Sequence, residues 1–389
     1  MKIGVPRESY PGERRVAIVP AVIPSLLKAG FEVVVEAGAG TEAAFPDAEY
    51  IAKGAKILAD RAEVFDVAEI IVQVLCHGSN DSTGRDDLVH MRPEHLLVGF
   101  LRPLGSIETI REVAERGVTS FAVELMPRTT RAQSMDALTS MATIAGYKSV
   151  VIGADRLPRL FPMLTTAAGT ITPARVLVIG AGVAGLQAIA TGRRLGAVVS
   201  AYDLRPASKE QVQSLGGRFV ELPVEAVDAQ DARGYARAQD DTFYERQRAL
   251  LGQVVAESDI VITAAVIPGK KSPVLVTADM VARMAPGSVI VDLAAERGGN
   301  CELTRAGELI VVSHGITIVG WLNLASTVPY HASQMYARNV SAFLLHLVKD
   351  GKPRMDLTDE IIRETLLTRG GEVVNARIRE FFSLPAMPN

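Results

Sequence analysis

An apolar strand, a glycine-rich turn and a helix-forming run follow one another within residues 175–190. The turn reads Gly180-Ala-Gly182-Val183-Ala-Gly185 and fits the pattern Gly-x-Gly-x-x-Gly. In that pattern the first glycine permits a tight turn, the second leaves the backbone open to a pyrophosphate, and the third lets the helix pack closely on the strand. The amino end of the helix then offers N–H groups and a positive dipole end to the phosphates. The segment therefore predicts a Rossmann domain with a dinucleotide site.

The next apolar run, residues 198–202, leads into Asp203, which lies about 20 residues beyond the turn, where this fold places an acidic residue. A carboxylate there accepts hydrogen bonds from the adenosine ribose hydroxyls and repels a 2′-phosphate. Arg205 follows closely and could hold a phosphate, but Asp203 comes first, so we expect NAD(H) rather than NADP(H). The alternative is a glycine-rich structural turn without a ligand.

Short apolar, β-branched runs alternate with helix-length segments along most of the 389 residues. This alternation is typical of βαβ units, so the predicted class is α/β with parallel sheets. A chain of this length usually forms more than one core, and we expect two Rossmann-like domains with a cleft between them. The predicted strands are residues 3–6, 31–36, 70–75, 96–101 and 119–125 in the first domain, and 175–179, 198–202, 218–221, 260–264, 288–292 and 317–319 in the second.

Good helix formers over residues 132–151 predict a long helix that joins the two domains. After Leu324 the pattern is helical, notably at residues 333–349 and 359–382. We expect these helices to return to the first domain, which is then discontinuous. The expected domains are residues 1–135 with 328–389, and residues 145–327.

Two other segments bear on the site. The polar residues 224–250 lie between two predicted strands, and we interpret the beginning of this segment either as a lid over the dinucleotide or as a solvated insertion. A second glycine-rich turn, residues 38–43, also follows an apolar run. Because Phe45-Pro46-Asp47 interrupts the helix that a phosphate site would need, we interpret it as a structural turn.

The composition argues against several classes of protein. The net charge is −3 with acidic and basic residues interspersed, so no nucleic-acid partner is expected. The two cysteines, Cys76 and Cys301, have no Cys-x-x-Cys spacing, which predicts neither a metal site nor a disulfide framework. No secretory segment opens the chain, and no apolar run reaches the roughly 18 residues of a membrane span. We therefore expect a cytoplasmic protein without a membrane span of its own.

Several motifs together resemble the alanine dehydrogenase and transhydrogenase family, and within it the soluble NAD(H)-binding alpha subunits (domain I) of proton-translocating NAD(P) transhydrogenases. The most specific is Arg131-Ala-Gln133-Ser-Met-Asp136, and the likeness covers nearly the whole chain. Further motifs are Gly12-Glu-Arg-Arg-Val-Ala, Thr165-Thr-Ala-Ala-Gly-Thr and Asp292-Leu-Ala-Ala-Glu-Arg-Gly-Gly-Asn-Cys301.

The resemblance implies an oxidoreductase that is active only with partner subunits. NADH bound to this chain would pass a hydride directly to NADP+ on a separate NADP(H)-binding subunit, of either stereospecific type. A membrane proton-channel subunit would couple that step to proton movement. The chain itself would be a homodimer, held peripherally at the inner membrane through its partners.

By the same resemblance, Arg128, Asp136 and Thr139 would fix the nicotinamide and its ribose or carboxamide, and Gln133 would reach the partner's nucleotide. Thr139 stands where serine is expected and keeps the hydroxyl. Gln133 and Asp136 lie three residues apart, so we expect them to share one helix face. Ion pairing for Arg128 and helix capping for Asp136 are the alternatives. The expected cofactor-binding residues are Arg128, Gln133, Asp136, Gly180, Gly182, Val183, Gly185, Asp203, Leu204, Arg205, Gly234, Tyr235, Gln247, Ala265 and Val266, with Tyr235 on a loop that closes over NAD.

Two other functions remain open. An alanine dehydrogenase needs an acid-base group and a cation for the substrate carboxylate. Resemblance to that family implies an arginine near the N-terminus, a lysine after the third strand and a histidine after the fourth. Only Arg15 fits here, and Glu296 stands where an aspartate is expected. The third possibility is a non-catalytic NAD-sensing module, which would have no use for Gln133.

Overall fold

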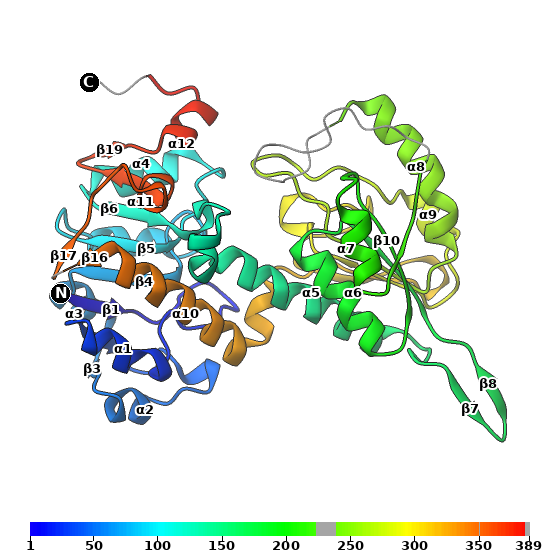
Figure 1. Cartoon of the computed structure of the whole chain (residues 1–389), viewed down its shortest axis with the longest axis horizontal. Helices are drawn as coiled ribbons and strands as arrows, with labels where there is room; N and C mark the ends of the chain where they lie inside the picture. Colours follow the sequence, from blue (N-terminus) through cyan, green and yellow to red (C-terminus); the bar gives the residue numbers. More distant parts are fainter. Residues whose placement is uncertain (223–238, 350, 386–389) are drawn as a thin grey trace. The chain divides into compact units, whose positions relative to one another are not determined.

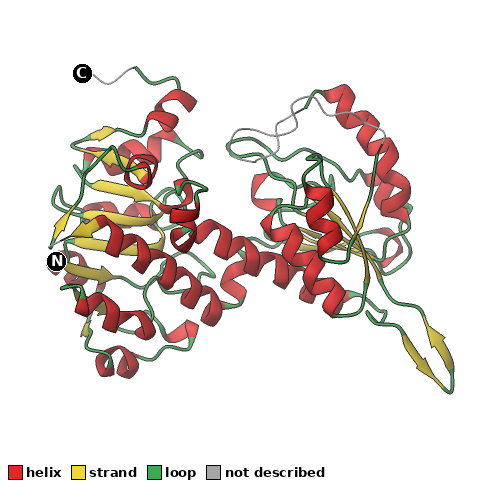
Figure 2. Ribbon diagram, in the orientation of Figure 1, coloured by secondary structure: helices red, strands yellow, loops and turns green. Residues whose placement is uncertain are grey.

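The computed structural model describes residues 1–222, 239–349 and 351–385. By contacts between Cα atoms it divides into two compact units, residues 1–141 with 326–389 and residues 142–325. Each unit contains one large sheet with helices on its faces (Figures 1 and 2). The α/β class predicted from the alternating pattern is confirmed.

The first unit contains an eight-stranded sheet in the order β19-β18-β6-β5-β4-β1-β2-β3. The strands from β1 to β6 pair in parallel, and β18 and β19 extend the sheet with antiparallel pairs. The strands are β1 (Lys2–Val5), β2 (Glu32–Glu36), β3 (Lys56–Leu58), β4 (Ile70–Leu75), β5 (Leu96–Phe100), β6 (Thr119–Ala122), β18 (Leu366–Arg369) and β19 (Glu372–Val373). The helices are α1 (Ile23–Lys28), α2 (Asp47–Ala52), α3 (Arg61–Val67), α4 (Ile107–Glu115), α10 (Pro329–Leu347), α11 (Glu360–Thr365) and α12 (Ala376–Phe381).

The helix predicted over residues 359–382 is wrong. Two short helices, α11 and α12, flank the hairpin of β18 and β19 instead. Gly370 and Gly371 both have positive φ angles and form its turn, which no continuous helix can include. Thr368 donates a hydrogen bond to the carbonyl of Val118, which helps to fix β18 between β6 and the edge strand β19.

The second unit contains a seven-stranded sheet in the order β11-β10-β9-β12-β13-β15-β14, in which only β14 pairs antiparallel. The chain runs outward from β9 to one side, then returns to β12 on the other, which leaves a switch point between these two strands. The strands are β9 (Arg175–Ile179), β10 (Val198–Tyr202), β11 (Arg218–Phe219), β12 (Ile260–Thr263), β13 (Val289–Asp292), β14 (Leu309–Val311) and β15 (Thr317–Val319). The helices are α6 (Val183–Arg194), α7 (Ser208–Ser214), α8 (Asp241–Ala256) and α9 (Ala278–Ala282).

The second sheet has a hydrophobic core on each face. Val176 and Val178 of β9 belong to one core cluster, whereas Leu177 and Ile179 belong to the other. Successive side chains of a strand point to opposite faces, so this strand is buried on both sides. Polar groups are therefore available for function mainly where the strands end.

A hairpin of β7 (Leu164–Thr166) and β8 (Gly169–Ile171) extends from the second unit (Figure 1). All residues of both strands are exposed, including Leu164 at 42% and Ile171 at 45%. In the part of the chain that the structure describes, no helix is long and apolar enough to cross a membrane.

Candidate functional site

The turn after β9 places its three glycines in three different surroundings. Gly180 has a φ of 97°, and a Cβ added there would lie 2.8 Å from the carbonyl carbon of Ala264. A Cβ on Gly185 would lie 1.9 Å from the carbonyl oxygen of Gly180. Among the described residues other than its immediate chain neighbours, a Cβ on Gly182 would have no atom within 4 Å. Packing therefore requires the first and third glycines, while the second borders open space.

Helix α6 begins directly at this open space. Its N-cap residue is Gly182, and no side chain caps the helix. The first N–H groups of an α-helix have no partner within the helix, and its dipole is positive at that end. The turn thus provides both the room and the hydrogen-bond donors for a phosphate.

The other glycine-rich turn has neither property. A Cβ on Gly40 would lie 2.5 Å from the carbonyl oxygen of Phe45. Only a short 3-10 helix, Thr41–Ala43, follows it, and Ala44 then adopts a left-handed conformation. The interpretation of this segment as a structural turn is confirmed.

Asp203 lies at the end of β10 and contacts the glycine turn. Its Oδ2 accepts a hydrogen bond from the Ala181 N–H at 2.7 Å. Its two oxygens also accept bonds from Arg205, at 2.8 Å from the backbone N–H, 2.9 Å from Nε and 3.0 Å from Nη2. These bonds raise the pKa of Arg205. A carboxylate has about four acceptor positions, so ribose hydroxyls can bind Asp203 only if a donor of Arg205 moves away.

The loop after β12 lies beside the same turn. The Ala264 N–H donates to the carbonyl of Ile179 at 2.7 Å, which continues the pairing of β12 with β9. The side-chain amide of Asn300 then binds both the N–H and the carbonyl of Ala265. The carboxyl ends of β9, β10 and β12 thus gather the predicted residues Gly180, Gly182, Val183, Gly185, Asp203, Leu204, Arg205, Ala265 and Val266.

Gln247 lies on α8 and is only 1% exposed. Its Nε2 donates to the hydroxyl of Tyr202 at 2.9 Å, and its Oε1 has no hydrogen-bond partner among the described residues. In this conformation Gln247 is a buried bridge between α8 and β10. The predicted cofactor-binding residues Gly234 and Tyr235 lie outside the described residues.

The first unit holds the remaining predicted residues, Arg128, Gln133, Asp136 and Thr139. Arg128 and Gln133 are exposed, and Gln133 lies on a 3-10 helix, η5 (Thr130–Met135). Asp136 accepts bonds from the N–H of Thr139 at 2.8 Å and from its hydroxyl at 2.6 Å. Asp136 therefore caps α5 (Ala137–Arg156), which is the capping alternative considered for it.

The helix predicted from residue 132 is corrected accordingly, because α5 starts only at Ala137. Asp136 has a φ of −79° and a ψ of 86°, outside the helical region, as an N-cap residue requires. Gln133 and Asp136 thus do not lie on one face of a single helix.

C-terminal residues that sequence reasoning missed hold this segment in place. Asn339 of α10 donates to the carbonyl of Ser134 at 2.8 Å and accepts from the hydroxyl of Ser140 at 2.7 Å. Arg131 pairs with Asp359 at 2.7 Å. These partners lie about 200 residues away in sequence, so no local pattern could have indicated them.

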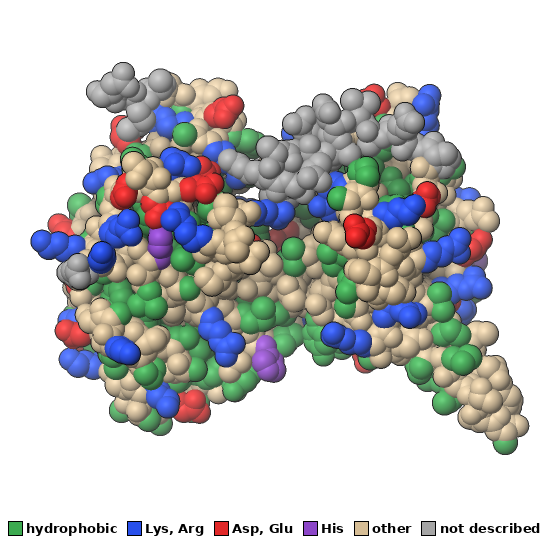
Figure 3. Space-filling view, in the orientation of Figure 1, with side chains coloured by type: hydrophobic (Ala, Val, Ile, Leu, Met, Phe, Trp, Pro, Cys, Tyr) green, Lys and Arg blue, Asp and Glu red, His purple; other side chains and the backbone are tan. Residues whose placement is uncertain are grey.

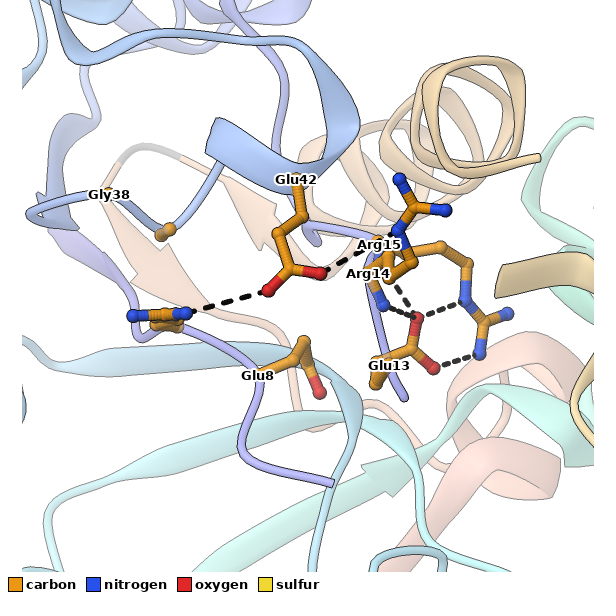
Figure 4. A pocket seen from close by; sticks show the side chains of 8 residues that line it. Glu8, Glu13, Arg14, Arg15, Gly38 and Glu42 are labelled. Atoms are coloured by element: carbon orange, nitrogen blue, oxygen red, sulfur yellow. Dashed lines mark hydrogen bonds and ion pairs between the residues drawn. The ribbon is translucent and has the colours of Figure 1, made fainter. Parts of the chain in front are cut away.

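Arg15, the one residue that fits an alanine dehydrogenase pocket, is already neutralised. Its Nε and Nη2 donate to the two carboxylate oxygens of Glu13 at 2.7 and 2.5 Å, and both side chains are buried (Figure 4). The adjacent cavity measures only about 10 Å³, roughly the room for one water molecule. Burial raises the pKa of nearby Glu8 to about 8. The cavity is lined by Arg7, Glu8, Glu13, Arg14, Arg15, Gly38, Ala39 and Glu42.

Another buried carboxylate in the first unit belongs to Glu124. Its Oε1 accepts the backbone N–H groups of Leu101 at 3.0 Å and Arg102 at 2.6 Å. Its Oε2 has no hydrogen-bond partner among the described residues. Burial raises the pKa of Glu124 to about 7.

Comparisons with known proteins cover both units. The family model "Alanine dehydrogenase/PNT, N-terminal domain" matches residues 4–145, and "Alanine dehydrogenase/PNT, C-terminal domain" matches residues 149–376. An NAD(P) transhydrogenase alpha subunit of Rhodospirillum rubrum is 46% identical over 96% of this chain and 98% of its own length. The alanine dehydrogenase of Bacillus subtilis is 30% identical over 96% of this chain and 92% of its own length.

Solved structures give the same result, because a transhydrogenase is more similar to this chain than an alanine dehydrogenase is. The transhydrogenase of Sinorhizobium meliloti superimposes with a TM-score of 0.82 at 42% identity, covering 97% of this chain and 100% of that chain. An L-alanine dehydrogenase superimposes with a TM-score of 0.80 at 26% identity, covering 98% and 99%. The chain belongs to the alanine dehydrogenase/PNT family, and within it to the alpha subunits of NAD(P) transhydrogenase.

Proposed function

We propose that this chain is the NAD(H)-binding subunit of a proton-translocating transhydrogenase. The observation that carries the proposal is the open space at Gly182, which adjoins the uncapped end of α6 and lies one residue from the bond between Ala181 and Asp203. Phosphates would bind at the helix end, and the ribose hydroxyls would bind Asp203. The membership of the chain among transhydrogenase alpha subunits supports NAD(H) here and NADP(H) on the partner subunit.

Bound NADH would supply a hydride, which passes directly to NADP+ held by the partner. The transfer itself needs no acid or base from the protein, so the contribution of this chain is to bind, orient and shield its nucleotide. Arg128 and Gln133 are both exposed; in the proposal Arg128 would bind the nicotinamide part of NAD(H), and Gln133 would reach the partner's nucleotide. Asp136 holds the hydroxyl of Thr139, which fixes the start of α5 behind them.

The ion pair of Arg15 with Glu13 argues against an alanine dehydrogenase. A guanidinium that is 3% exposed and already neutralised by a buried carboxylate is poorly placed to hold the carboxylate of an amino acid. The cavity beside it has no room for a substrate. Both observations support a hydride acceptor that a partner supplies.

The proposed assembly contains an NADP(H)-binding subunit, a membrane proton-channel subunit and two copies of this chain, located in the cytoplasm at the inner membrane. An isolated two-stranded hairpin is only marginally stable in water, and the β7–β8 hairpin exposes Leu164 and Ile171. Figure 3 shows hydrophobic side chains on the surface of this projecting hairpin. A second copy of this chain that covered these side chains would stabilise the hairpin. This supports a homodimer.

The test is an activity assay of the purified chain with NADH and an NADP+ analogue, with and without the NADP-binding subunit. We expect no appreciable turnover until that subunit is added. Alanine-dependent reduction of NAD by this chain alone would overturn the proposal, and NADH binding without transfer in the full complex would favour an NAD-sensing module.

A further inference from the structure

Asn300 is fully buried and uses its side-chain amide to hold one residue of a neighbouring loop. Its Oδ1 accepts from the Ala265 N–H at 3.0 Å, and its Nδ2 donates to the Ala265 carbonyl at 2.9 Å. The same Nδ2 donates to the carbonyl of Pro273 at 2.9 Å. Both polar groups of the Ala265 backbone are therefore satisfied by a single side chain.

Asn300 is itself held by Asp292, which lies at the end of β13 and is 1% exposed. The Asp292 Oδ2 accepts from the backbone N–H of Asn300 at 2.8 Å, from that of Cys301 at 3.0 Å and from the Thr304 hydroxyl at 2.7 Å. The Asp292 Oδ1 accepts from the hydroxyl of Thr263 at 2.8 Å. This network ties the ends of β12 and β13 together.

The loop after β12, which contains Ala265, packs against the glycine turn after β9. A Cβ on Gly180 would lie 2.9 Å from both the carbonyl oxygen of Ala264 and the backbone nitrogen of Ala265. Because Gly180 has so little space around it, a change in the orientation of the Ala265 peptide would move atoms that pack against the turn. Ligands of open α/β sheets bind at this edge, beside the switch point.

We infer that Asn300 is a positioning residue of the dinucleotide site. By fixing the Ala265 peptide, it keeps the loop after β12 in the conformation that packs against Gly180, the first glycine of the turn. The inference rests on the proposed binding of NAD(H) at this turn and adds a residue that lies outside the fingerprint motif in the sequence.

The variant Asn300→Asp tests it, because it keeps the size of the side chain and its acceptor for the Ala265 N–H. It removes the donor, so the carbonyls of Ala265 and Pro273 lose their partner and face a carboxyl group instead. Fluorescence titration with NADH should give a dissociation constant at least about 10-fold higher than that of the wild type, because restoring the loop on binding would cost the free energy of one or two buried hydrogen bonds.

The chain offers a matched control in Asn375 of the first unit. This asparagine is 4% exposed, accepts from the Ile378 N–H at 3.2 Å, and donates to the carbonyls of Glu364 at 2.8 Å and Leu366 at 3.0 Å. Asn375→Asp therefore makes the same chemical change away from the glycine turn. We expect it to lower Tm by a similar amount and to leave the dissociation constant for NADH unchanged.

If Asn300→Asp lowers Tm but binds NADH as tightly as the wild type, Asn300 is merely structural and the inference fails. If this variant does not fold, Thr263→Val provides the second test, because it removes one donor to Asp292 at nearly constant volume. The loss of that hydrogen bond, about half a kcal/mol or more, should weaken the binding of NADH 2- to 5-fold. Unchanged binding by a folded Thr263→Val would then refute the inference. A wild-type chain that binds no NADH would instead refute the proposed function itself.

Discussion

Replacing Asp203 by asparagine isolates the charge that we assign to NAD(H) recognition. The substitution keeps the shape of the side chain, which is 7% exposed and bonded to Ala181 and Arg205. A hydrogen bond to a charged group contributes roughly 1.5–3 kcal/mol, and little solvent screens this one. One such loss corresponds to a dissociation constant for NADH that is about 10- to 150-fold higher.

The same change should also reduce the preference for NADH over NADPH. The carboxylate would no longer repel a 2′-phosphate, and the Arg205 guanidinium would lose its ion pair and become available to a phosphate. Calorimetric titration of the wild type and Asp203→Asn with both nucleotides measures the two effects. We expect NADH binding to weaken and NADPH binding to stay constant or to strengthen.

Asp259 provides the control, because it is also a buried aspartate that pairs with an arginine, Arg159, and accepts a backbone N–H, that of Arg175, at 2.8 Å. Arg175 begins β9, so this pair lies at the opposite end of the strand from the glycine turn. Asp259→Asn should cost stability without changing NADH binding. Equal binding of NADH by wild type and Asp203→Asn, or equal weakening by both variants, would refute the assignment.

Gly182→Ala should abolish tight NADH binding with little change in Tm, because its Cβ enters the open space where the cofactor would lie. Gly185→Ala should lower Tm, because its Cβ would lie 1.9 Å from a carbonyl oxygen. A larger fall in Tm for Gly182→Ala than for Gly185→Ala would contradict this reasoning. Gln133→Asn should slow hydride transfer in the complex while leaving NADH affinity unchanged, and a large loss of affinity would show that its role is misplaced. The folded pKa of Glu124 is raised from 4.5 to about 7, so the stabilisation by its neutral form is complete below pH 4.5 and is lost as the pH rises through 7. Calorimetry between pH 4.5 and 7 should therefore show the Tm of the wild type falling relative to that of Glu124→Gln. Parallel curves of Tm against pH for the two proteins would refute the raised pKa of Glu124. Replacing residues 164–171 with a short flexible linker should yield a monomer in analytical ultracentrifugation, and an unchanged dimer would exclude the hairpin from the interface.

The local sequence pattern is enough to predict those regions of the fold whose structure depends on residues close together in the sequence. The strand at residues 175–179, the following turn and the helix from Val183 appear as predicted, because the glycines, the β-branched run and the helix formers act over a few residues. The same holds for the strand that ends before Asp203.

Partners distant in sequence decided the rest. Residues 366–369 form a strand because β6 pairs with them across more than 240 residues, and apolar spacing alone did not distinguish this from a helix. Asn300 and Ala265 are 35 residues apart, so nothing in the motif around Asn300 indicated which peptide its amide binds. The sequence leaves two roles open for Asp136, and the bonds to Thr139 show that it caps α5.

The central claim is that NADH bound to this chain passes its hydride directly to NADP+ on a partner subunit. NADH carrying deuterium at the transferred position, mixed with this chain, the NADP-binding subunit and NADP+, tests that claim by mass spectrometry of the NADPH formed. Full retention of deuterium in NADPH, and no product when either protein is omitted, is the predicted result. Loss of the deuterium to solvent, or NADPH formation by this chain alone, would contradict it.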